Sequence, residues 1–409
     1  MIGWRLTVSH APALTYRETV RSSAVLVAGV MLVAGCASHH GAHGDSPVAA
    51  PSDQHSAAHN APTTAAAALK AGSGERIVTV GVPTDFAPQA PAGATDEYRC
   101  FVVDPGLTED VMITGTEFQP GNPAIVHHSI LFAATPEQVP AAEQLDAADP
   151  EPGYECFGGA MLPARGGVLA GLDESDWITA WAPGGDANEL PDGYGMALPK
   201  GGRIVIQMHY NLRSEQGIDN TAVRLRVSDR TLKPLRTMLL PAPVELPCAP
   251  GESGRLCDRT DAVDDVVSRF GADSGATIAG LQLLCGGDPD APRASEVQTC
   301  DRPVTKDAKV FAVAGHMHLL GREISVTLNP GEADEKVLLD IRNWDFDQQG
   351  AIPLTSPVRV VPGDTLRVKC RHDPTLRQQL PALQGTPARY VVWGEGTTDE
   401  MCLAILLNG

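Results

Sequence analysis

Short apolar runs separated by glycine and proline account for most of this chain. Runs such as 203–212 and 401–407 are rich in valine, isoleucine and leucine, and turn signals such as Pro362-Gly363-Asp364 stand between them. Long stretches of helical periodicity are nearly absent. Many short strands with turn residues between them are typical of all-β sandwiches. The pattern predicts an all-β fold of antiparallel sandwiches, with short helices or long loops in the acidic, alanine-rich segments 137–153 and 258–275.

The first 35 residues have the pattern of an export signal. Arg17 and Arg21 precede an apolar run at 24–34, which is too short to span a bilayer, and small residues stand before Cys36. The stretch that ends at Cys36 resembles a bacterial lipobox, and Ala37 after it resembles the outer-membrane variant. We predict a signal peptide at 1–35, lipidation of Cys36 and anchoring to the outer membrane through several buried acyl chains. An ordinary secretory signal that ends near a cysteine is the alternative.

Residues 36–74 contain mostly Ala, Pro, Ser, Gly and His. Such a segment buries too little apolar surface to offset its ordering entropy, so we predict a disordered tether after the lipidated cysteine. The remaining chain is too long for one ordinary core and about right for two domains. We place the boundary near 228–234, which gives an N-terminal β-sandwich at 75–232 and a C-terminal β-sandwich at 233–409.

The charge and the cysteines restrict the function. The net charge of −19 argues against a nucleic-acid partner, which needs a basic surface. Cys36 aside, the chain has eight cysteines, and an even number in an exported chain indicates disulfides. No Cys-x-x-Cys pair occurs among them, which weakens the case for a zinc site made of thiolates.

The histidines are unevenly distributed. Six of the twelve lie in the first sixty residues, where those of the tether are interpreted as incidental. Five of the other six form three groups: His127-His128, His209 and His316-x-His318. Residues at i and i+2 share a face of a strand, so His316 and His318 can converge on one ion. The adjacent His127 and His128 can do so only if the strand bends or bulges, or if their rings use different nitrogens.

This grouping predicts two metal sites, one with three imidazoles and one with two imidazoles and the thioether of Met401. Imidazole suits copper and zinc alike, but a thioether is a soft ligand that selects Cu(I). Copper is therefore the metal that the ligand set favours. His372, two residues after Cys370 on a predicted strand, is interpreted as an ordinary surface or capping histidine.

An ordered series of motifs resembles the copper type II, ascorbate-dependent monooxygenases, the family of dopamine β-monooxygenase and peptidylglycine α-hydroxylating monooxygenase. The matches run in family order from Tyr98 to the C-terminus. They are Tyr98-Arg99-Cys100, Val126-His127-His128, Trp181-Ala182-Pro183-Gly184-Gly185, Gln207-Met208-His209-Tyr210-Asn211, Gly315-His316-Met317-His318-Leu319-Leu320-Gly321, Trp344-Asp345-Phe346, Gly394-Glu395-Gly396 and Asp399-Glu400-Met401-Cys402.

The resemblance implies two copper ions per chain, one in each sandwich, with a cleft between them. His127, His128 and His209 match the ligands of the electron-storing copper, and Tyr98 and Gln207 match residues near it. His316, His318 and Met401 match the catalytic copper. The implied reaction hydroxylates a C–H bond of a small organic substrate with O₂ and electrons from ascorbate or another reductant.

The resemblance also implies two disulfides, Cys100–Cys156 and Cys370–Cys402. The other four cysteines allow three pairings, of which Cys248–Cys300 with Cys257–Cys285 is preferred. The pattern departs from the peptide-amidating branch of the family. That branch has an arginine two positions before the His-x-His couplet and Asn and Tyr after the Met-Cys pair, whereas this chain has Ala314, Leu403 and Ile405. An apolar or weakly polar substrate is expected in place of a glycine-extended peptide.

Two other functions compete with the monooxygenase. A copper-binding lipoprotein for storage or delivery would use the same ligands without catalysis, although storage proteins repeat their ligands and these are few. A structural β-sandwich displayed at the cell surface would fold without metal and hold no stoichiometric copper. Oxygen consumption that depends on a reductant separates the monooxygenase from the copper-binding lipoprotein.

Overall fold

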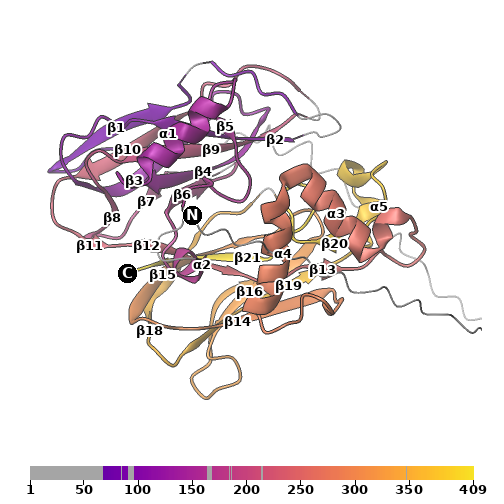
Figure 1. Ribbon diagram of the computed structural model, residues 1–409. Coiled ribbons are helices and arrows are strands. Elements are labelled where there is room, and N and C mark those ends of the chain that lie inside the picture. Colours follow the sequence, from indigo (N-terminus) through magenta and orange to yellow (C-terminus); the bar gives the residue numbers. More distant parts are fainter. Residues whose placement is uncertain are drawn as a thin grey trace, which may run out of the picture. The chain divides into compact units, whose positions relative to one another are not determined.

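The computed structural model describes residues 68–83, 85–90, 96–163, 168–183, 185, 187–212, 215–346 and 348–409 (Figure 1). Over these residues the chain consists mainly of antiparallel strands with few helices, which confirms the all-β prediction. The predicted signal peptide, Cys36 and most of the tether lie outside the described residues. All the described residues belong to one compact unit, Gln54–Gly409. No helix in the described part of the chain is long and apolar enough to cross a membrane.

The N-terminal half contains a six-stranded and a five-stranded sheet. The first has the order β1-β10-β3-β8-β11 with β7 paired to β3, and the second has the order β5-β2-β9-β4-β6. The strands of the first are β1 (Glu75–Gly81), β3 (Val111–Gln119), β7 (Asn188–Glu189), β8 (Tyr194–Leu198), β10 (Ala222–Ser228) and β11 (Lys233–Pro234). Those of the second are β2 (Asp96–Val103), β4 (Val126–Ala134), β5 (Tyr154–Glu155), β6 (Trp177–Trp181) and β9 (Arg203–Asn211). Two helices, α1 (Val139–Ala148) and α2 (Val168–Asp173), complete this half.

Alternating side chains explain why these two sheets pack face to face. On β10, Val223, Leu225 and Val227 are buried, while Arg224 and Arg226 between them are partly exposed. The buried residues join Phe101 of β2 and Ile206 of β9 in one apolar core between the sheets. Successive side chains of a strand point to opposite faces, so this alternation gives each sheet one apolar face. The central strand β9, in contrast, is buried along nearly its whole length.

The C-terminal half contains two four-stranded sheets and a short ribbon. The orders are β12-β21-β15-β18, β14-β19-β16-β17 and β13-β20. The strands are β12 (Arg236–Pro241), β13 (Glu245–Leu246), β14 (Val297–Pro303), β15 (Ala308–His316), β16 (Gly321–Leu328), β17 (Lys336–Ile341), β18 (Ile352–Val360), β19 (Thr365–His372), β20 (Val391–Val392) and β21 (Leu403–Asn408). The helices are η2 (Arg255–Cys257), α3 (Arg259–Phe270), α4 (Ala272–Leu284), α5 (Leu376–Gln379) and η3 (Pro381–Leu383).

Two of the helices lie in and beyond the alanine-rich segment predicted at 258–275. The Asp258 side chain accepts hydrogen bonds from the backbone N–H groups of Thr260 and Asp261, which caps the N-terminus of α3. Gly271, with φ of 83°, ends α3 and separates it from α4. The two helices lie side by side in Figure 1. Val266 of α3 and Ile278 of α4 belong to the apolar core of the C-terminal half.

Two of the four disulfides have the pairing predicted from the sequence, and the other two have a different pairing. The structure contains Cys100–Cys156 and Cys370–Cys402, as the resemblance implied. The remaining four cysteines form Cys248–Cys257 and Cys285–Cys300, so the preferred pairing of Cys248–Cys300 with Cys257–Cys285 is wrong. The physical reason is a tight turn after Cys248, closed by a hydrogen bond from Glu252 N to Ala249 O. This turn returns the chain to Cys248 before α3 begins.

The described part of the chain begins within the predicted tether. Residues 68–74 fall in the predicted tether, yet Leu69 is only 1% exposed. Its backbone N–H donates to the Glu117 carboxylate on β3 at 3.1 Å. Leu69 is a large apolar group in a segment that otherwise has almost none, which explains why it packs against the sheet. Leu69 thus packs on the N-terminal half, although it lies in the segment predicted as tether.

Candidate metal centre

Three histidines meet where β4 and β9 run side by side. His127 and His128 belong to β4, and His209 belongs to β9. The register between the two antiparallel strands shifts there. Val126 pairs with Tyr210 and His128 pairs with His209, so these partners are two residues apart on β4 but adjacent on β9. His127 is thus the extra residue of a bulge. A bulge turns two neighbouring side chains towards the same side, which a regular strand cannot do. The sequence predicted that a bend or bulge would let adjacent His127 and His128 share an ion, and the structure contains a bulge.

The ring nitrogens of the three histidines face one another. The Nδ1 atoms of His127 and His128 lie 3.2 Å apart, those of His127 and His209 3.2 Å, and those of His128 and His209 3.1 Å. All three side chains therefore present the same ring atom to a common point. Three imidazole nitrogens at about 2.0–2.1 Å from one ion would stand at nearly this separation. Among the described residues, this is a group that could hold a metal ion.

Two neighbours hold the His209 ring. Its Nε2 atom lies 2.9 Å from Oδ1 of Asp96 on β2, so the carboxylate fixes the proton on Nε2 and leaves the Nδ1 lone pair free. The Tyr98 ring stacks on the imidazole at 4.1 Å between centroids and an interplanar angle of 12°. The Tyr98 hydroxyl donates to the backbone carbonyl of Glu395 at 2.6 Å. Tyr98 therefore lies next to the three histidines, as the resemblance implied.

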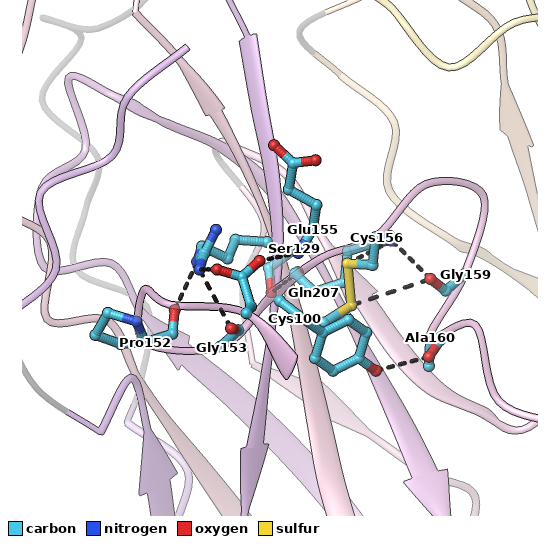
Figure 2. Close-up of a disulfide and its surroundings, with 12 residues drawn as sticks. Cys100, Ser129, Pro152, Gly153, Glu155, Cys156, Gly159, Ala160 and Gln207 are labelled. Carbon is cyan, nitrogen blue, oxygen red and sulfur yellow. Dashed lines mark hydrogen bonds and ion pairs between the residues drawn. A yellow bond between two sulfur atoms is a disulfide. The ribbon is translucent and has the colours of Figure 1, made fainter. Parts of the chain in front are cut away.

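Gln207 is placed differently. Its Nε2 atom donates to the Gly159 carbonyl at 3.2 Å and lies 3.5 Å from the Cys156 sulfur. Figure 2 shows Gln207 beside the Cys100–Cys156 bridge, which joins β2 to the segment after β5. Ser129 of β4 donates to the Gln207 carbonyl at 2.8 Å. The contacts of Gln207 support the disulfide and its loop rather than an imidazole ring.

Burial keeps the imidazoles of the first two histidines neutral. It lowers the pKa of His127 and of His128 well below the ordinary value, and the neighbouring His209 adds to the effect. A neutral imidazole has a free lone pair, which is the form that binds a metal. At neutral pH, a metal therefore does not have to displace a proton from either ring.

His316 and His318 lie at the end of β15 and just beyond it. Their ring centroids are 5.2 Å apart with the planes at 87°. Nδ1 of His316 lies 2.6 Å from the Gln349 amide oxygen, and Nδ1 of His318 lies 3.3 Å from the Asp399 carbonyl. These contacts occupy Nδ1 in both rings and leave Nε2 as the atom for a ligand. Burial lowers the pKa of His316 to about 3 and also lowers the pKa of His318.

Met401 lies two residues before the start of β21, which pairs with β15. His316 pairs with Leu403, two residues after Met401. The methionine is 7% exposed, and the Cys370–Cys402 bridge fixes the residue that follows it. The Glu400 carboxylate accepts hydrogen bonds from His318 N at 2.9 Å and Met401 N at 3.3 Å. Sheet pairing and one buried carboxylate therefore bring the backbone of Met401 close to that of His316 and His318.

The two histidine groups are neighbours in this structure. The ring centroids of His128 and His316 lie 6.1 Å apart. The Phe346 ring stacks on His127 at 4.9 Å and lies 6.3 Å from His318. The solvent-facing cleft implied by the resemblance therefore does not separate His128 from His316 here.

For four residues near the histidines, the sequence predicted no individual role: Asp96, Gln349, Phe346 and Glu400. Phe346 and Glu400 lie within quoted motifs, but nothing in those motifs shows which atoms they contact. Asp96 lies two residues before the Tyr98 motif, and Gln349 three residues after Phe346. Their contacts depend on pairing between distant strands and loops, so the local sequence holds no signal for them.

Part of the chain matches a known protein family. Residues 294–407 match the family model described as copper type II ascorbate-dependent monooxygenase, C-terminal domain. The matched region contains His316, His318 and Met401. Residues 294–407 belong to this copper monooxygenase family. The chain is also 25% identical over 295 residues to "DBH-like monooxygenase protein 1" of Homo sapiens and 23% identical over 289 residues to the protein of that name from Gallus gallus.

These relatives are much longer than the chain. The match covers 71% of this chain but 40% of the human protein, and 69% of this chain but 39% of the chicken protein. Among solved structures, the major capsid protein P2 of bacteriophage PM2 matches 81% of this chain and 97% of its own, at 9% identity and a TM-score of 0.28. An overlap this low carries no argument about fold or function.

Proposed function

We propose that this protein is a copper-dependent monooxygenase that hydroxylates a C–H bond of a small organic substrate. The reaction converts the substrate, O₂, two electrons and two protons into the alcohol and water, and the electrons come from an external one-electron reductant such as ascorbate. The membership of residues 294–407 in the copper monooxygenase family supports the reaction class. The convergence of three Nδ1 atoms on one point is the observation that carries the proposal.

The first copper would be held by His127, His128 and His209. Its donors are three imidazoles, two of them kept neutral by desolvation and the third oriented by Asp96. Imidazole ligands suit copper, and the copper proposed at this site stores and passes one electron. The role we propose for this group is to supply the second electron of each turnover.

The second copper would be held by His316, His318 and Met401. When bound there, copper would supply the activation of O₂, because a thioether ligand favours the reduced Cu(I) state. The chain's own residues would fix the ligands. Gln349 holds one ring through Nδ1, and the Asp399 carbonyl holds the other. The proposed role of Trp344 and Phe346, which are both partly buried, is to keep water from the ligands. Trp344 Nε1 donates to the His318 carbonyl at 3.2 Å.

The substrate is proposed to be apolar or weakly polar. Ala314 pairs with Ile405, and His316 pairs with Leu403, so all three apolar side chains named by the sequence lie on the strands beside His316. None of them can bind a carboxylate by charge. A substrate held by apolar contact fits this lining better than a peptide with a C-terminal carboxylate.

The proposed location is the outer membrane of a bacterial envelope, with the protein anchored by lipid at Cys36. The four disulfides support an oxidising compartment. Metabolic labelling with a radioactive fatty acid tests the anchor. Label in the wild type that disappears in Cys36→Ser supports it, and label that persists in Cys36→Ser, or is absent from both, contradicts it.

The first test of function measures bound copper and O₂ uptake on the purified protein. The variants are His128→Ala and Met401→Ala, with Met161→Ala as the control because Met161 is 50% exposed. We expect two copper ions in the wild type and the control, and one weakened site in each of the other variants. Both of these should also lose the uptake of O₂ that depends on reductant and substrate.

Other outcomes of this test favour the competing functions. Two copper ions without reductant-dependent O₂ uptake on any substrate would favour a copper-binding lipoprotein. Copper that is unaffected by His128→Ala would contradict the first site, and copper that is unaffected by Met401→Ala would contradict the second. A protein that binds no copper at all would be left as a structural β-sandwich.

A further inference from the structure

His372 is fully buried, contrary to its interpretation as a surface or capping histidine. It is the last residue of β19, two residues after Cys370, and its side chain has 0% exposure. It pairs with Gly321 of β16, the residue that closes the Gly315–Gly321 motif. The side chain therefore lies inside the C-terminal half, near the segment that carries His316 and His318.

The His372 imidazole contacts the backbone of Met401. Its Nε2 atom lies 3.2 Å from the Met401 carbonyl oxygen and 3.4 Å from Oε2 of Glu400. The same Glu400 carboxylate accepts the N–H groups of His318, Leu320 and Met401. One buried imidazole and one buried carboxylate thus connect the strand β19, the loop after His316 and the peptide of Met401.

This contact complements the Cys370–Cys402 disulfide. The bridge fixes Cys402, one residue after Met401, but leaves the peptide between Glu400 and Met401 free to turn about its own dihedral angles. Glu400 holds that peptide at the Met401 N–H, and His372 holds the following peptide, between Met401 and Cys402, at the Met401 carbonyl. A thioether on a flexible side chain reaches a metal only if its Cα–Cβ direction is set, and the two contacts set it.

The environment of His372 argues for a specific role of its ring nitrogen. Its Nδ1 atom is buried and has no hydrogen-bond partner among the described residues. A buried polar atom without a partner costs free energy, whereas a phenylalanine would fill nearly the same space without that cost. The imidazole is therefore explained by the contact of Nε2 with Met401, not by packing.

We infer that His372 is a positioning residue, which fixes the Met401 backbone so that the thioether faces His316 and His318. The inference rests on the proposed function, because it takes Met401 as a copper ligand. It assigns His372 no contact with copper, O₂ or substrate.

The test compares His372→Gln with His372→Asn. A glutamine amide nitrogen reaches about as far as imidazole Nε2 and can still donate to the Met401 carbonyl, whereas the asparagine amide is too short. His372→Phe, which keeps the ring volume, serves as the packing control. The first measurement is hydrogen exchange at the Met401 and Cys402 amides in the metal-free protein. We expect faster exchange there in the Asn and Phe variants and nearly wild-type exchange in the Gln variant.

The second measurement is X-ray absorption of the Cu(I)-loaded protein, together with Cu(I) affinity by chelator competition. We expect the copper–sulfur signal and the affinity of the Met401 site to fall in the Asn and Phe variants, the affinity by about 10- to 100-fold, which is typical of lost ligand support. The site of His127, His128 and His209 should be unchanged. The Gln variant should keep both signals.

The outcomes distinguish this inference from the proposed function. A wild type without a copper–sulfur signal contradicts Met401 as a ligand, and the hydrogen exchange of the metal-free variants then still decides whether His372 fixes its backbone. Equal exchange in all variants overturns the inference. So does a copper–sulfur signal that survives in the Asn and Phe variants while only the melting temperature falls, because His372 would then be merely structural.

Discussion

At the scale of single residues, burial shifts the pKa values of ionisable groups around the candidate metal centre. Burial keeps His127, His128, His316 and His318 neutral, as metal ligands require. Glu395 shows the same effect on an acid. Burial raises its pKa to about 7, although hydrogen bonds from Trp393 and Gly158 oppose the shift. The folded protein thus favours the protonated form of Glu395.

This shift predicts a pH dependence of stability. The folded pKa of Glu395 is raised above its unfolded value, so its contribution is fully present below the unfolded pKa near 4.5 and is lost as the pH rises through about 7. Between these two pH values the free energy of unfolding of the wild type should fall as the pH rises. We expect this fall to be smaller in Glu395→Gln. Urea unfolding at several pH values measures this change, with Glu323→Gln, at a partly exposed residue, as control. Identical slopes in the wild type and Glu395→Gln would show that folding does not raise the pKa of Glu395.

At the scale of elements, an ion-pair cluster ties α3 to the loop before Met401. Arg269 of α3 donates two hydrogen bonds to Asp399, at 2.8 and 2.7 Å, and Arg389 donates a third at 3.1 Å. Burial would raise the pKa of Asp399, but these guanidinium groups hold it below its ordinary value. The helix and the loop therefore depend on each other through a carboxylate that is 2% exposed.

We expect Asp399→Asn to lower the free energy of unfolding by about 3–5 kcal/mol, because it leaves two guanidinium groups without their buried partner. Chemical denaturation measures the change. Asp307→Asn, which breaks an exposed pair with Arg359, is the control and should change little. Equal effects of the two substitutions would contradict a special role for the buried cluster.

The disulfides give a second prediction at this scale. The Cys370–Cys402 bridge closes a sequence separation of 32 residues and Cys248–Cys257 one of 9. Loop-closure entropy grows with loop length, so replacing the first pair by serine should cost about 4 kcal/mol and replacing the second about 3 kcal/mol. Thermal unfolding of both double variants tests the order. The opposite order would show that the Met401 segment is held mainly by its hydrogen bonds.

At the scale of the whole molecule, the candidate sites draw ligands from distant parts of the chain. His128 and His209 are 81 residues apart, and His318 and Met401 are 83 residues apart (401 − 318). A metal that binds only the folded chain therefore stabilises long-range contacts in both halves. The stabilisation follows from mass action and reaches about 2.7 kcal/mol when the free ligand is at a hundred times its dissociation constant.

We accordingly expect a copper chelator to lower the melting temperature of the copper-loaded protein and added Cu(I) to restore it. The variant His128→Ala should keep part of the shift through the second site, and the double variant His128→Ala/Met401→Ala should lose nearly all of it. Differential scanning calorimetry measures both. A melting temperature that does not respond to copper in the wild type would contradict copper binding to the folded state.

The sequence alone determined the all-β class, the two histidine groups and the family resemblance. These features are recorded locally, in strand alternation, in turn residues and in motifs of a few residues. It also stated the condition under which adjacent His127 and His128 share a site, a bulge in their strand. The structure supplied that bulge in the register between β4 and β9.

Only the tertiary structure decided what depends on chain segments meeting across long separations. It paired Cys248 with Cys257 and Cys285 with Cys300, against the preferred pairing, because a turn after Cys248 reverses the chain. It placed Gln207 on a disulfide and brought Asp96 to His209. It buried His372 against Met401. A side chain's neighbours across a sheet are set by strand register, and register is a property of the whole fold rather than of any one segment.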